Sequence, residues 1–322
     1  RNICERVQTM NNAENILDKV KRIHFVGIGG AGVSPIAEIL MRKGYQISGS
    51  DQAQSETLER VMSWGVPVFV GHSPNNIGDA QALVYTSACK PDNPELVEAK
   101  RRGIPTLERC VMLGMLTDRY SRLIGVSGTH GKTTTTSMLT EIFIEAGQDP
   151  SAIIGGKLPL IGSNCLCGGS DTIICEADEY VETFLHLHPA VSVILNIDAD
   201  HLDYYKSFDN VAEAFKKYAE RTSGLLVVNG GSKEALQIAE AHAASGKPTA
   251  TFGLDDSCDY YPAGLREEPG VCEDFSLMCR GKDLGRVGLR VPGVHNMMNA
   301  LAAAATAHSL GIAAEVICAS LS

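Results

Sequence analysis

Residues 128–135 have the types and order of a loop that binds the phosphates of a nucleotide. They read Gly-Thr-His-Gly-Lys-Thr-Thr-Thr and stand between a short apolar run and residues spaced as in a helix. Backbone N–H groups of such a turn cradle phosphates, Lys132 would reach the terminal phosphates, and the Thr133 hydroxyl can ligate Mg²⁺. The usual spacing would need a glycine at Val126, and Gly128 provides a shorter loop instead. The pattern favours a phosphate site over a helix start that binds nothing.

Two polar clusters follow apolar runs that we expect to be strands, at 172–175 and 191–195. Ligands of open α/β sheets gather outside the carboxyl ends of the strands. Glu176 directly follows the first run, and its carboxylate suits Mg²⁺, which takes few protein oxygens together with substrate phosphate. His201 follows the second run, but histidine is a less typical ligand of Mg²⁺, so its spacing leaves a metal role and a structural role equally open. Three further acids of these clusters could be solvated charges: Asp178, Glu179 and Asp203.

A second glycine-rich run, Gly27–Gly32, has the pattern G-x-G-x-x-G between an expected strand and an expected helix. The glycines allow a tight turn and let the backbone contact a pyrophosphate at a helix N-terminus. Asp51 ends the next expected strand, where an acid can reach a ribose hydroxyl. The motif therefore favours a bound nucleotide diphosphate over a ligand-free turn, and it does not distinguish NAD from other such nucleotides.

Expected strands and helices alternate in two series. The first has strands at 23–26, 45–49, 66–70, 82–86 and near 104, with helices at 33–44, 56–63 and 94–102. The second has strands at 123–126, 172–175, 191–196, 225–228 and 287–291, with helices at 133–146 and 296–310. Such alternation implies parallel sheets covered on both faces. We therefore expect an α/β protein: a Rossmann-like domain with a parallel sheet, followed by a P-loop-type α/β domain that binds ATP, with the boundary within 117–121.

Composition narrows the class of protein. The chain has 322 residues, 44% of them hydrophobic and 20% charged, which is ordinary for a folded protein of two domains. Its net charge of −10 argues against sequence-independent binding of nucleic acid, and no apolar run approaches the ~20 residues of a membrane helix. The 10 cysteines show neither C-x-x-C pairs nor zinc-site spacing, so we expect reduced thiols in a cytoplasmic protein.

Four motifs, in the same order and at similar separations, resemble those of the Mur ligase family. They are the glycine-rich opening at 27–37, the loop at 128–135, the Asp-His-x-Asp at 200–203 and the run His-Asn-Met-Met-Asn-Ala at 295–300. The resemblance covers nearly all of residues 23–312, and the opening is similar to that of the alanine-adding branch of the family.

The resemblance implies a role for each motif. The first domain would bind the UDP part of its substrate through Gly29, Gly30, Ala31 and Gly32, with Asp51, His72 and Ser87 as further contacts. The second domain would bind ATP through Gly128, Thr129, His130, Gly131, Lys132, Thr133 and Thr134, and through His295, Asn296 and Asn299. Mg²⁺ would be held by Thr133, Glu176 and His201, and the catalytic residues would be Lys132, Glu176 and His201.

The activity that the resemblance implies is ATP-dependent ligation of L-alanine to UDP-N-acetylmuramate through an acyl phosphate, in the synthesis of peptidoglycan precursors. Such a protein would use ATP and Mg²⁺ and would need no partner among nucleic acids or membranes. Two other functions stay open at this point. One is a nucleotide-binding fragment without catalytic activity; the other is an NAD-dependent dehydrogenase, which would leave the Gly-Lys-Thr loop unexplained.

The resemblance also predicts domain limits and two departures. We expect a leader at 1–22, a UDP-sugar-binding domain at 23–118, an ATP-binding domain at 119–314 and the start of a mostly missing domain at 315–322, so that the chain would be inactive alone. Tyr180 and Val181 stand where the family commonly has Ser-Asp. Lys216 stands where some relatives carry a carbamylated lysine, but its amphipathic surroundings favour a surface lysine.

Overall fold

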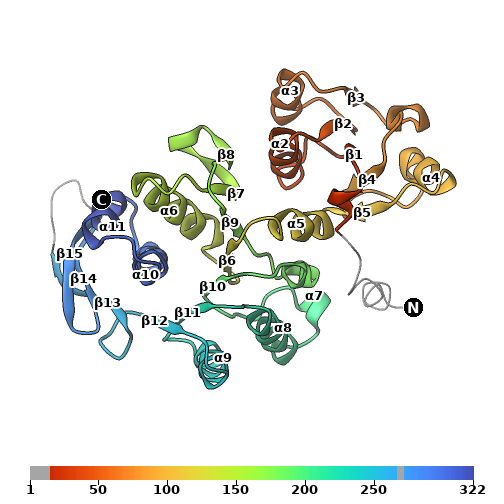
Figure 1. The fold of residues 1–322 in the computed structure, drawn as a ribbon. Coiled ribbons are helices and arrows are strands. Elements are labelled where there is room, and N and C mark those ends of the chain that lie inside the picture. Colours follow the sequence, from red (N-terminus) through yellow and green to blue (C-terminus); the bar gives the residue numbers. More distant parts are fainter. Residues whose placement is uncertain (1–14, 267–271) are drawn as a thin grey trace. The chain divides into compact units, whose positions relative to one another are not determined.

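The computed structural model describes residues 15–266 and 272–322, and the chain divides into two compact units between Arg119 and Tyr120 (Figure 1). Each unit has its own sheet, with helices alternating with strands along the chain. The expected α/β class, a parallel N-terminal sheet followed by an ATP-binding type of α/β fold, is confirmed.

The sheet of the first unit has five parallel strands in the order β3-β2-β1-β4-β5. The strands are β1 (Arg22–Val26), β2 (Gln46–Asp51), β3 (Val68–Val70), β4 (Ala82–Tyr85) and β5 (Thr106–Glu108). The helices are η2 (Ile16–Asp18), α2 (Ser34–Arg42), α3 (Glu56–Ser63), η3 (Pro74–Ile77), α4 (Pro94–Arg101) and α5 (Arg109–Thr117). The strand order reverses between β1 and β4, which in open α/β sheets opens a crevice at the carboxyl ends.

The first unit begins before β1. Leu17 in η2 is 2% exposed, and its carbonyl accepts a hydrogen bond from the Tyr45 hydroxyl at 2.7 Å. The Asn15 side chain donates to the carbonyl of Met115 in α5 at 2.9 Å. Residues 15–22 of the leader expected over 1–22 thus include Leu17, an apolar core residue of this unit. Residues 1–14 lie outside the described residues.

The sheet of the second unit has ten strands in the order β15-β14-β13-β12-β11-β10-β6-β9-β7-β8. Its parallel part consists of β6 (Arg122–Ser127), β7 (Ser151–Leu158), β9 (Thr172–Glu176), β10 (Val191–Ile194), β11 (Leu225–Asn229) and β12 (Thr249–Phe252). At one end, β8 (Ser163–Leu166) pairs antiparallel with β7. At the other end, β13 (Tyr260–Arg266) pairs parallel with β12, and β14 (Glu273–Cys279) and β15 (Lys282–Leu289) follow in antiparallel pairing. The helices are α6 (Lys132–Glu145), η4 (Pro159–Ile161), η5 (Tyr180–His186), α7 (Leu202–Tyr205), α8 (Phe208–Glu220), α9 (Lys233–Ala244), α10 (Val294–Ser309) and α11 (Ala314–Leu321).

Several strands of this sheet were not expected from the sequence. Strand β7 contains the pair Gly155-Gly156, and glycine weakens a strand signal because it has no side chain to pack. Strands β13 and β14 are partly exposed and carry many polar residues, so they lack the continuous apolar run of a buried parallel strand. The strand expected at 287–291 is the second half of β15.

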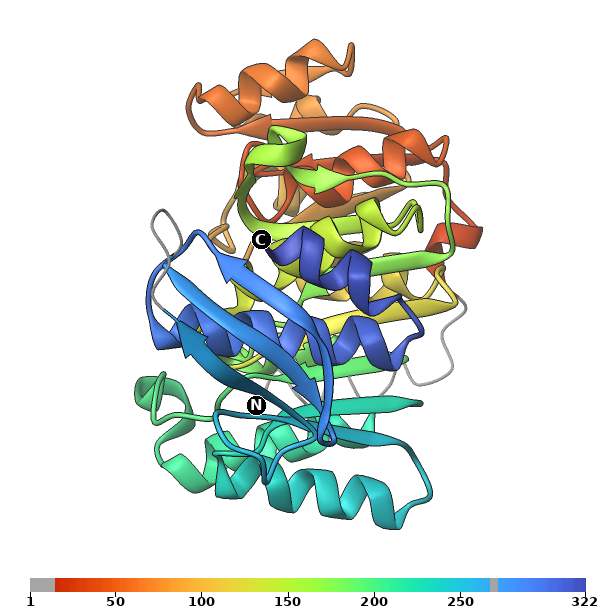
Figure 2. The same ribbon diagram turned by 90° about the vertical axis from the view of Figure 1, so that its left-hand side faces the viewer.

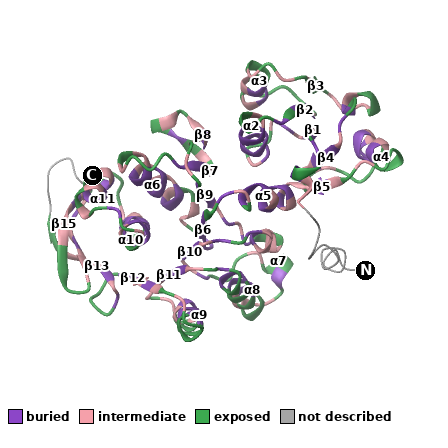
Figure 3. Cartoon of the chain, viewed as in Figure 1, coloured by how far each residue is buried: buried purple, intermediate pink, exposed green. Residues whose placement is uncertain are grey.

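Helices α6, α10 and α11 share one apolar core with the sheet. In α10, Ala302 to Ala305 are each 0% exposed, and Figure 3 shows this helix as largely buried. The antiparallel strands β13 to β15 lie beside α10 and α11 (Figure 2).

The last helix belongs to this same core. Ile317 and Leu321 of α11 are 0% and 8% exposed, and α11 packs on α6 and β15. Residues 315–322, which we expect to start another domain, thus have apolar side chains that are buried in the second unit.

Candidate functional site

The phosphate loop links the end of β6 to the start of α6. Gly128 and Gly131 have φ values of 137° and 87°, which residues with a Cβ rarely adopt. A Cβ on Gly131 would lie 2.3 Å from Asn299 Oδ1, and one on Gly128 would lie 2.9 Å from Leu195 Cβ. Both glycines are therefore needed for the loop to fit between β10 and α10.

The residues that follow β10 hold the loop in place. The Asn196 side chain accepts a hydrogen bond from His130 N at 2.8 Å and donates one to His130 O at 2.9 Å. The Thr129 hydroxyl accepts from Asp198 N at 3.0 Å. Thr129 and His130 thus fix the shape of the loop. Thr134 lies further on, half-buried in the first turn of α6. The part played by Asn196 was not predicted, although an asparagine directly after a strand that ends beside a glycine loop is a usable signal.

Lys132 is bound by two protein oxygens. Its Nζ donates to Gly128 O and to Glu179 Oε2, each at 2.7 Å. The side chain of Glu179 is only 2% exposed, and its other oxygen, Oε1, has no hydrogen-bond partner among the described residues. His201 Nε2 lies 3.9 Å from that oxygen. Glu179 is therefore a buried acid at the loop and not a solvated charge.

Glu176 and Thr133 face each other across Gly155 of β7. Gly155 N donates to Glu176 Oε1 at 2.5 Å, and burial raises the pKa of the Glu176 carboxyl despite that hydrogen bond. A Cβ on Gly155 would lie 2.6 Å from Glu176 Oε2 and 2.9 Å from Thr133 Oγ1. The absent Cβ leaves space beside one carboxylate and one hydroxyl, which are the hard oxygen ligands that Mg²⁺ prefers. Thr133 and Glu176 therefore fit Mg²⁺.

His201 lies near Glu179, on a different element. It precedes α7 in the left-handed conformation, with φ at 53°, and its ring centroid is 4.7 Å from that of Tyr180. Asp203, two residues further on, is exposed. Of the acids that follow β9 and β10, Glu179 is the one placed within an ion-pair distance of His201 in the described residues.

The N-terminal turn of α10 contributes the amide groups. Asn299 is 7% exposed, lies against Gly131 and donates to Asn296 Oδ1 at 3.4 Å. Asn296 in turn donates to Pro292 O at 2.8 Å. His295 is exposed. The structure thus brings Asn299 directly to the phosphate loop and Asn296 behind it.

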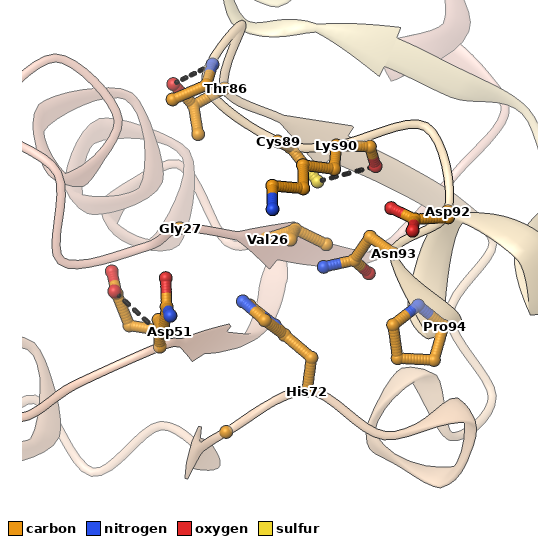
Figure 4. Close-up of a pocket in the computed structure, with 13 residues that line it drawn as sticks. Val26, Gly27, Asp51, His72, Thr86, Cys89, Lys90, Asp92, Asn93 and Pro94 are labelled. Atoms are coloured by element: carbon orange, nitrogen blue, oxygen red, sulfur yellow. Dashed lines mark hydrogen bonds between the residues drawn. The ribbon is translucent and has the colours of Figure 1, made fainter.

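The first unit contains a cavity of about 500 Å³ at the carboxyl ends of β1, β2 and β4 (Figure 4). Figure 4 shows Asp51, His72 and Lys90 around the same space. Asp51 also accepts a hydrogen bond from Gly29 N at 2.9 Å, so its carboxylate fixes the first glycine-rich turn. A volume of this size is in the range of small-molecule sites.

Not all residues expected at this site line the cavity. Its lining includes Asp51 and His72, but not Ser87, which is exposed, nor the turn residues Gly29, Gly30, Ala31 and Gly32. Lys90 was not predicted, yet it is the only lysine or arginine that lines this cavity in the described part of the chain. A Cβ on Gly32 would lie 3.1 Å from Arg109 Nη1, which places a second unpredicted cation beside the turn.

A buried acid lies directly behind His72. Glu95 is 0% exposed and accepts hydrogen bonds from Ser50 Oγ and Asn76 Nδ2, each at 2.6 Å, while His24 Nε2 lies 3.3 Å away. Burial alone would raise the pKa of Glu95, but these hydrogen bonds outweigh it and lower the pKa from 4.5 to about 2. The carboxylate of Glu95 therefore stabilises the folded first unit.

This network predicts a specific loss of stability in acid. Because the folded pKa is depressed, the contribution of Glu95 is complete above about pH 4.5 and is lost as pH falls toward about 2. Relative to Glu95→Gln, the native chain should be about 3 kcal/mol more stable in the first unit at neutral pH, and this difference should vanish near pH 2. Hydrogen exchange of the β1 and β2 amides measures it. Exposed Glu59→Gln is the control, and a pH-independent difference for Glu95→Gln would contradict the prediction.

Comparison with known proteins places both units in one family. A model described as the Mur ligase family, catalytic domain, matches residues 22–121, and one described as the Mur ligase middle domain matches residues 126–307. The chain belongs to the Mur ligase family. This membership accounts for both glycine-rich turns, which the dehydrogenase alternative does not.

Individual Mur ligases are similar over most of this chain. A UDP-N-acetylmuramate–L-alanine ligase of Aquifex aeolicus is 44% identical over 302 residues, which are 93% of this chain and 65% of that protein. One of Clostridium botulinum is 42% identical over 289 residues, 89% of this chain and 62% of that protein. The chain thus spans slightly less than two thirds of the length of these relatives.

Solved Mur ligase structures agree in fold. A UDP-N-acetylmuramate–alanine ligase of Thermotoga maritima matches with a TM-score of 0.82 at 29% identity, over 93% of this chain and 67% of that chain. A ligase of Neisseria meningitides for UDP-N-acetylmuramate and L-alanyl-γ-D-glutamyl-meso-diaminopimelate has a TM-score of 0.82 at 27% identity, over 94% of this chain and 97% of that chain.

Two positions at which the sequence was compared with the family pattern, 180–181 and 216, can be located in the structure. Tyr180 and Val181, which replace the Ser-Asp expected from the family pattern, are 42% and 45% exposed, and Tyr180 contacts the His201 ring. Lys216 is 53% exposed on α8 and pairs with Glu213, as expected of a surface lysine. Among the described residues, no helix has the length and apolar character needed to cross a membrane.

Proposed function

We propose that this chain carries the two nucleotide-binding parts of a cytoplasmic ligase that joins L-alanine to UDP-N-acetylmuramate and hydrolyses ATP in doing so. The observation that carries the proposal is the loop at 128–135, in which Lys132, Thr133 and Glu176 converge where ATP phosphates and Mg²⁺ would lie. The relatives named above support the choice of substrates.

The second unit would activate the sugar substrate. The lactyl carboxylate of UDP-N-acetylmuramate attacks the γ-phosphorus of ATP, ADP leaves, and an acyl phosphate forms. The amine of L-alanine then attacks the acyl carbon, and the amide forms as phosphate leaves and the amine loses a proton. No protein nucleophile is needed, so the work of the chain is to position two anions and to neutralise charge.

Each group of the loop has a part in this scheme. The backbone N–H groups of 128–134 would cradle the phosphates, and the ammonium of Lys132, beside Gly128 O and Glu179, would reach the terminal phosphates. Mg²⁺, held by Thr133 and Glu176, would supply charge neutralisation at the phosphate oxygens. Asn296 and Asn299, beside Gly131, are placed for the adenosine part.

The first unit would hold the UDP-sugar in the cavity at the carboxyl ends of β1, β2 and β4. Lys90 offers a charge for the diphosphate, while Asp51 and His72 offer hydrogen bonds to hydroxyl groups. The same proposal includes contacts through Gly29–Gly32 and Ser87, and His201 as a Mg²⁺ ligand. It also includes domain limits at 23–118 and 119–314.

Calorimetry with the 322-residue chain tests the function. UDP-N-acetylmuramate should bind, and Lys90→Ala should weaken it about 10-fold or more, because a charged hydrogen bond contributes about 1.5–3 kcal/mol. Lys43→Ala, on the far end of α2 and away from the cavity lining, is the control.

Activity is the second readout. The relatives are longer, and amide formation needs the amine held against the acyl phosphate with water kept out. We therefore expect binding of both nucleotides with negligible formation of UDP-N-acetylmuramoyl-L-alanine by this chain alone. Failure to bind UDP-N-acetylmuramate, or tighter binding of NADH, would overturn the proposal.

A further inference from the structure

We infer that Glu179 is a positioning residue that holds Lys132 and His201 in one arrangement and sets which ring nitrogen of His201 carries the proton. The inference deepens the proposed function and rests on it for its consequence in metal binding. Its starting observation is the buried carboxylate described above, with one oxygen on Lys132 and the other without a partner among the described residues.

The backbone around Glu179 is fixed on both sides. The Tyr205 hydroxyl donates a hydrogen bond to the carbonyl of Glu179. Val181 and Glu182 have φ values of 53° and 55°, and a β-branched residue such as valine rarely adopts this conformation. The turn they make directs the 2% exposed Glu179 side chain inward while Tyr180 stays outside. The carboxylate is thus held in place by its own segment and not only by its ion pair.

The two oxygens of this carboxylate face two different functional groups. Oε2 accepts from Lys132 Nζ at 2.7 Å, and Oε1 lies 3.9 Å from His201 Nε2. A buried acceptor without a partner is unfavourable, so a donor nearby is favoured. A hydrogen on Nε2 of His201 is that donor after a small rotation of the ring, whose centroid lies 4.7 Å from that of Tyr180.

This contact determines the tautomer of His201. With the hydrogen on Nε2, the lone pair of Nδ1 is free to face a cation or a phosphate-bound group. Histidines that ligate metals commonly donate their other N–H to a carboxylate, which orients the ring, and loss of that partner lowers metal affinity about 10- to 100-fold. Glu179 would thereby couple the phosphate-loop lysine to the imidazole through a single side chain.

Replacing Glu179 with glutamine distinguishes the positioning role of this residue from a role in packing alone. In Glu179→Gln the amide oxygen can still accept from Lys132, and the amide nitrogen then faces His201. Because that nitrogen is a donor, His201 Nε2 must become an acceptor, and its proton moves to Nδ1. Glu182→Gln is the matched control, since Glu182 lies in the same turn but contacts Lys217 at 3.9 Å and not His201.

The ¹⁵N shifts of the His201 ring, measured without metal or nucleotide at about pH 8.5 where imidazole is commonly neutral, report the tautomer directly. We expect the Nε2–H form in the native chain and in Glu182→Gln, and the Nδ1–H form in Glu179→Gln. The native spectrum alone tests the inference, whatever the stability of the variants. An Nδ1–H form in the native chain, or the same tautomer in Glu179→Gln, overturns it.

Mn²⁺ binding in the presence of ATP, followed by electron paramagnetic resonance, is the second measurement. Glu179→Gln should weaken Mn²⁺ about 10- to 100-fold, and Glu182→Gln should leave it unchanged. If the native chain binds no Mn²⁺–ATP, the proposed function fails, whereas the tautomer is still read from the metal-free spectrum. Equal Mn²⁺ affinity in the native chain and Glu179→Gln contradicts the positioning role.

Discussion

Replacing Lys132 with alanine is expected to weaken ATP binding about 10- to 100-fold, because the change removes a charged hydrogen-bond donor from the phosphates. It should also destabilise the second unit by about 3–5 kcal/mol, since the carboxyl group of Glu179, at 2% exposure, would lose its ammonium partner. Calorimetric titration with ATP and unfolding in urea measure the two effects separately. Sequence alone predicts the first effect and not the second.

A second substitution separates these effects. In Lys132→Ala combined with Glu179→Gln, most of the lost stability should return, because the buried charge is gone, while ATP affinity should stay low. Lys216→Ala removes an exposed lysine of the same charge and should change neither quantity. A folded Lys132→Ala protein with native ATP affinity would show that the phosphates do not lie at this loop.

Replacing Gly155 with alanine is expected to abolish the gain in ATP affinity that Mg²⁺ provides. The added Cβ would lie 2.6 and 2.7 Å from the two carboxylate oxygens of Glu176 and 2.9 Å from Thr133 Oγ1, so it fills the space beside the metal ligands. Gly155 is exposed in β7 and its φ lies outside the left-handed region, so the backbone accepts alanine without strain. ATP titrations with and without Mg²⁺ provide the measurement.

The neighbouring glycine is the control for that experiment. A Cβ on Gly156 would meet only the Thr133 methyl group, at 3.3 Å, and would leave the Glu176 carboxylate untouched. Gly156→Ala should therefore retain most of the Mg²⁺ effect. If Gly155→Ala binds Mg²⁺–ATP like the native chain, then Glu176 and Thr133 are not the pair that holds the metal.

The parts of this fold that could be predicted are those whose secondary structure is determined by residues close together in the sequence. Strand, glycine turn and helix follow one another at 23–42 and 122–145, and periodicity with glycine placement indicates both turns. Strand β7 could not be predicted, because the need for glycine at position 155 arises from the side chains of β9 and α6 that lie beside it. The place of helix α11 is not decided by local sequence, because eight apolar-rich residues do not reveal which core they join.

The candidate site divides in the same way. Lys132, Thr133 and Glu176 can be predicted because each has a fixed place relative to a strand end. Glu179 could not be told from an exposed acid, since its burial follows from the turn at Val181 and from Lys132, 47 residues away in the chain. Lys90 belongs to a loop whose position follows from the pairing of β4 with β1, which spacing along the chain does not report.

Helix α10 restricts how this chain can diverge over evolutionary time. Its alanines from 302 to 305 have no exposed surface, so each position accepts only a side chain of nearly the same volume. Asn299 lies on the same helix and touches the backbone of Gly131. Any substitution that pushes the helix outward would also withdraw this amide from the nucleotide loop. Packing and the proposed nucleotide site therefore constrain the same sixteen-residue segment, in which side-chain volume is restricted at every one of these alanines.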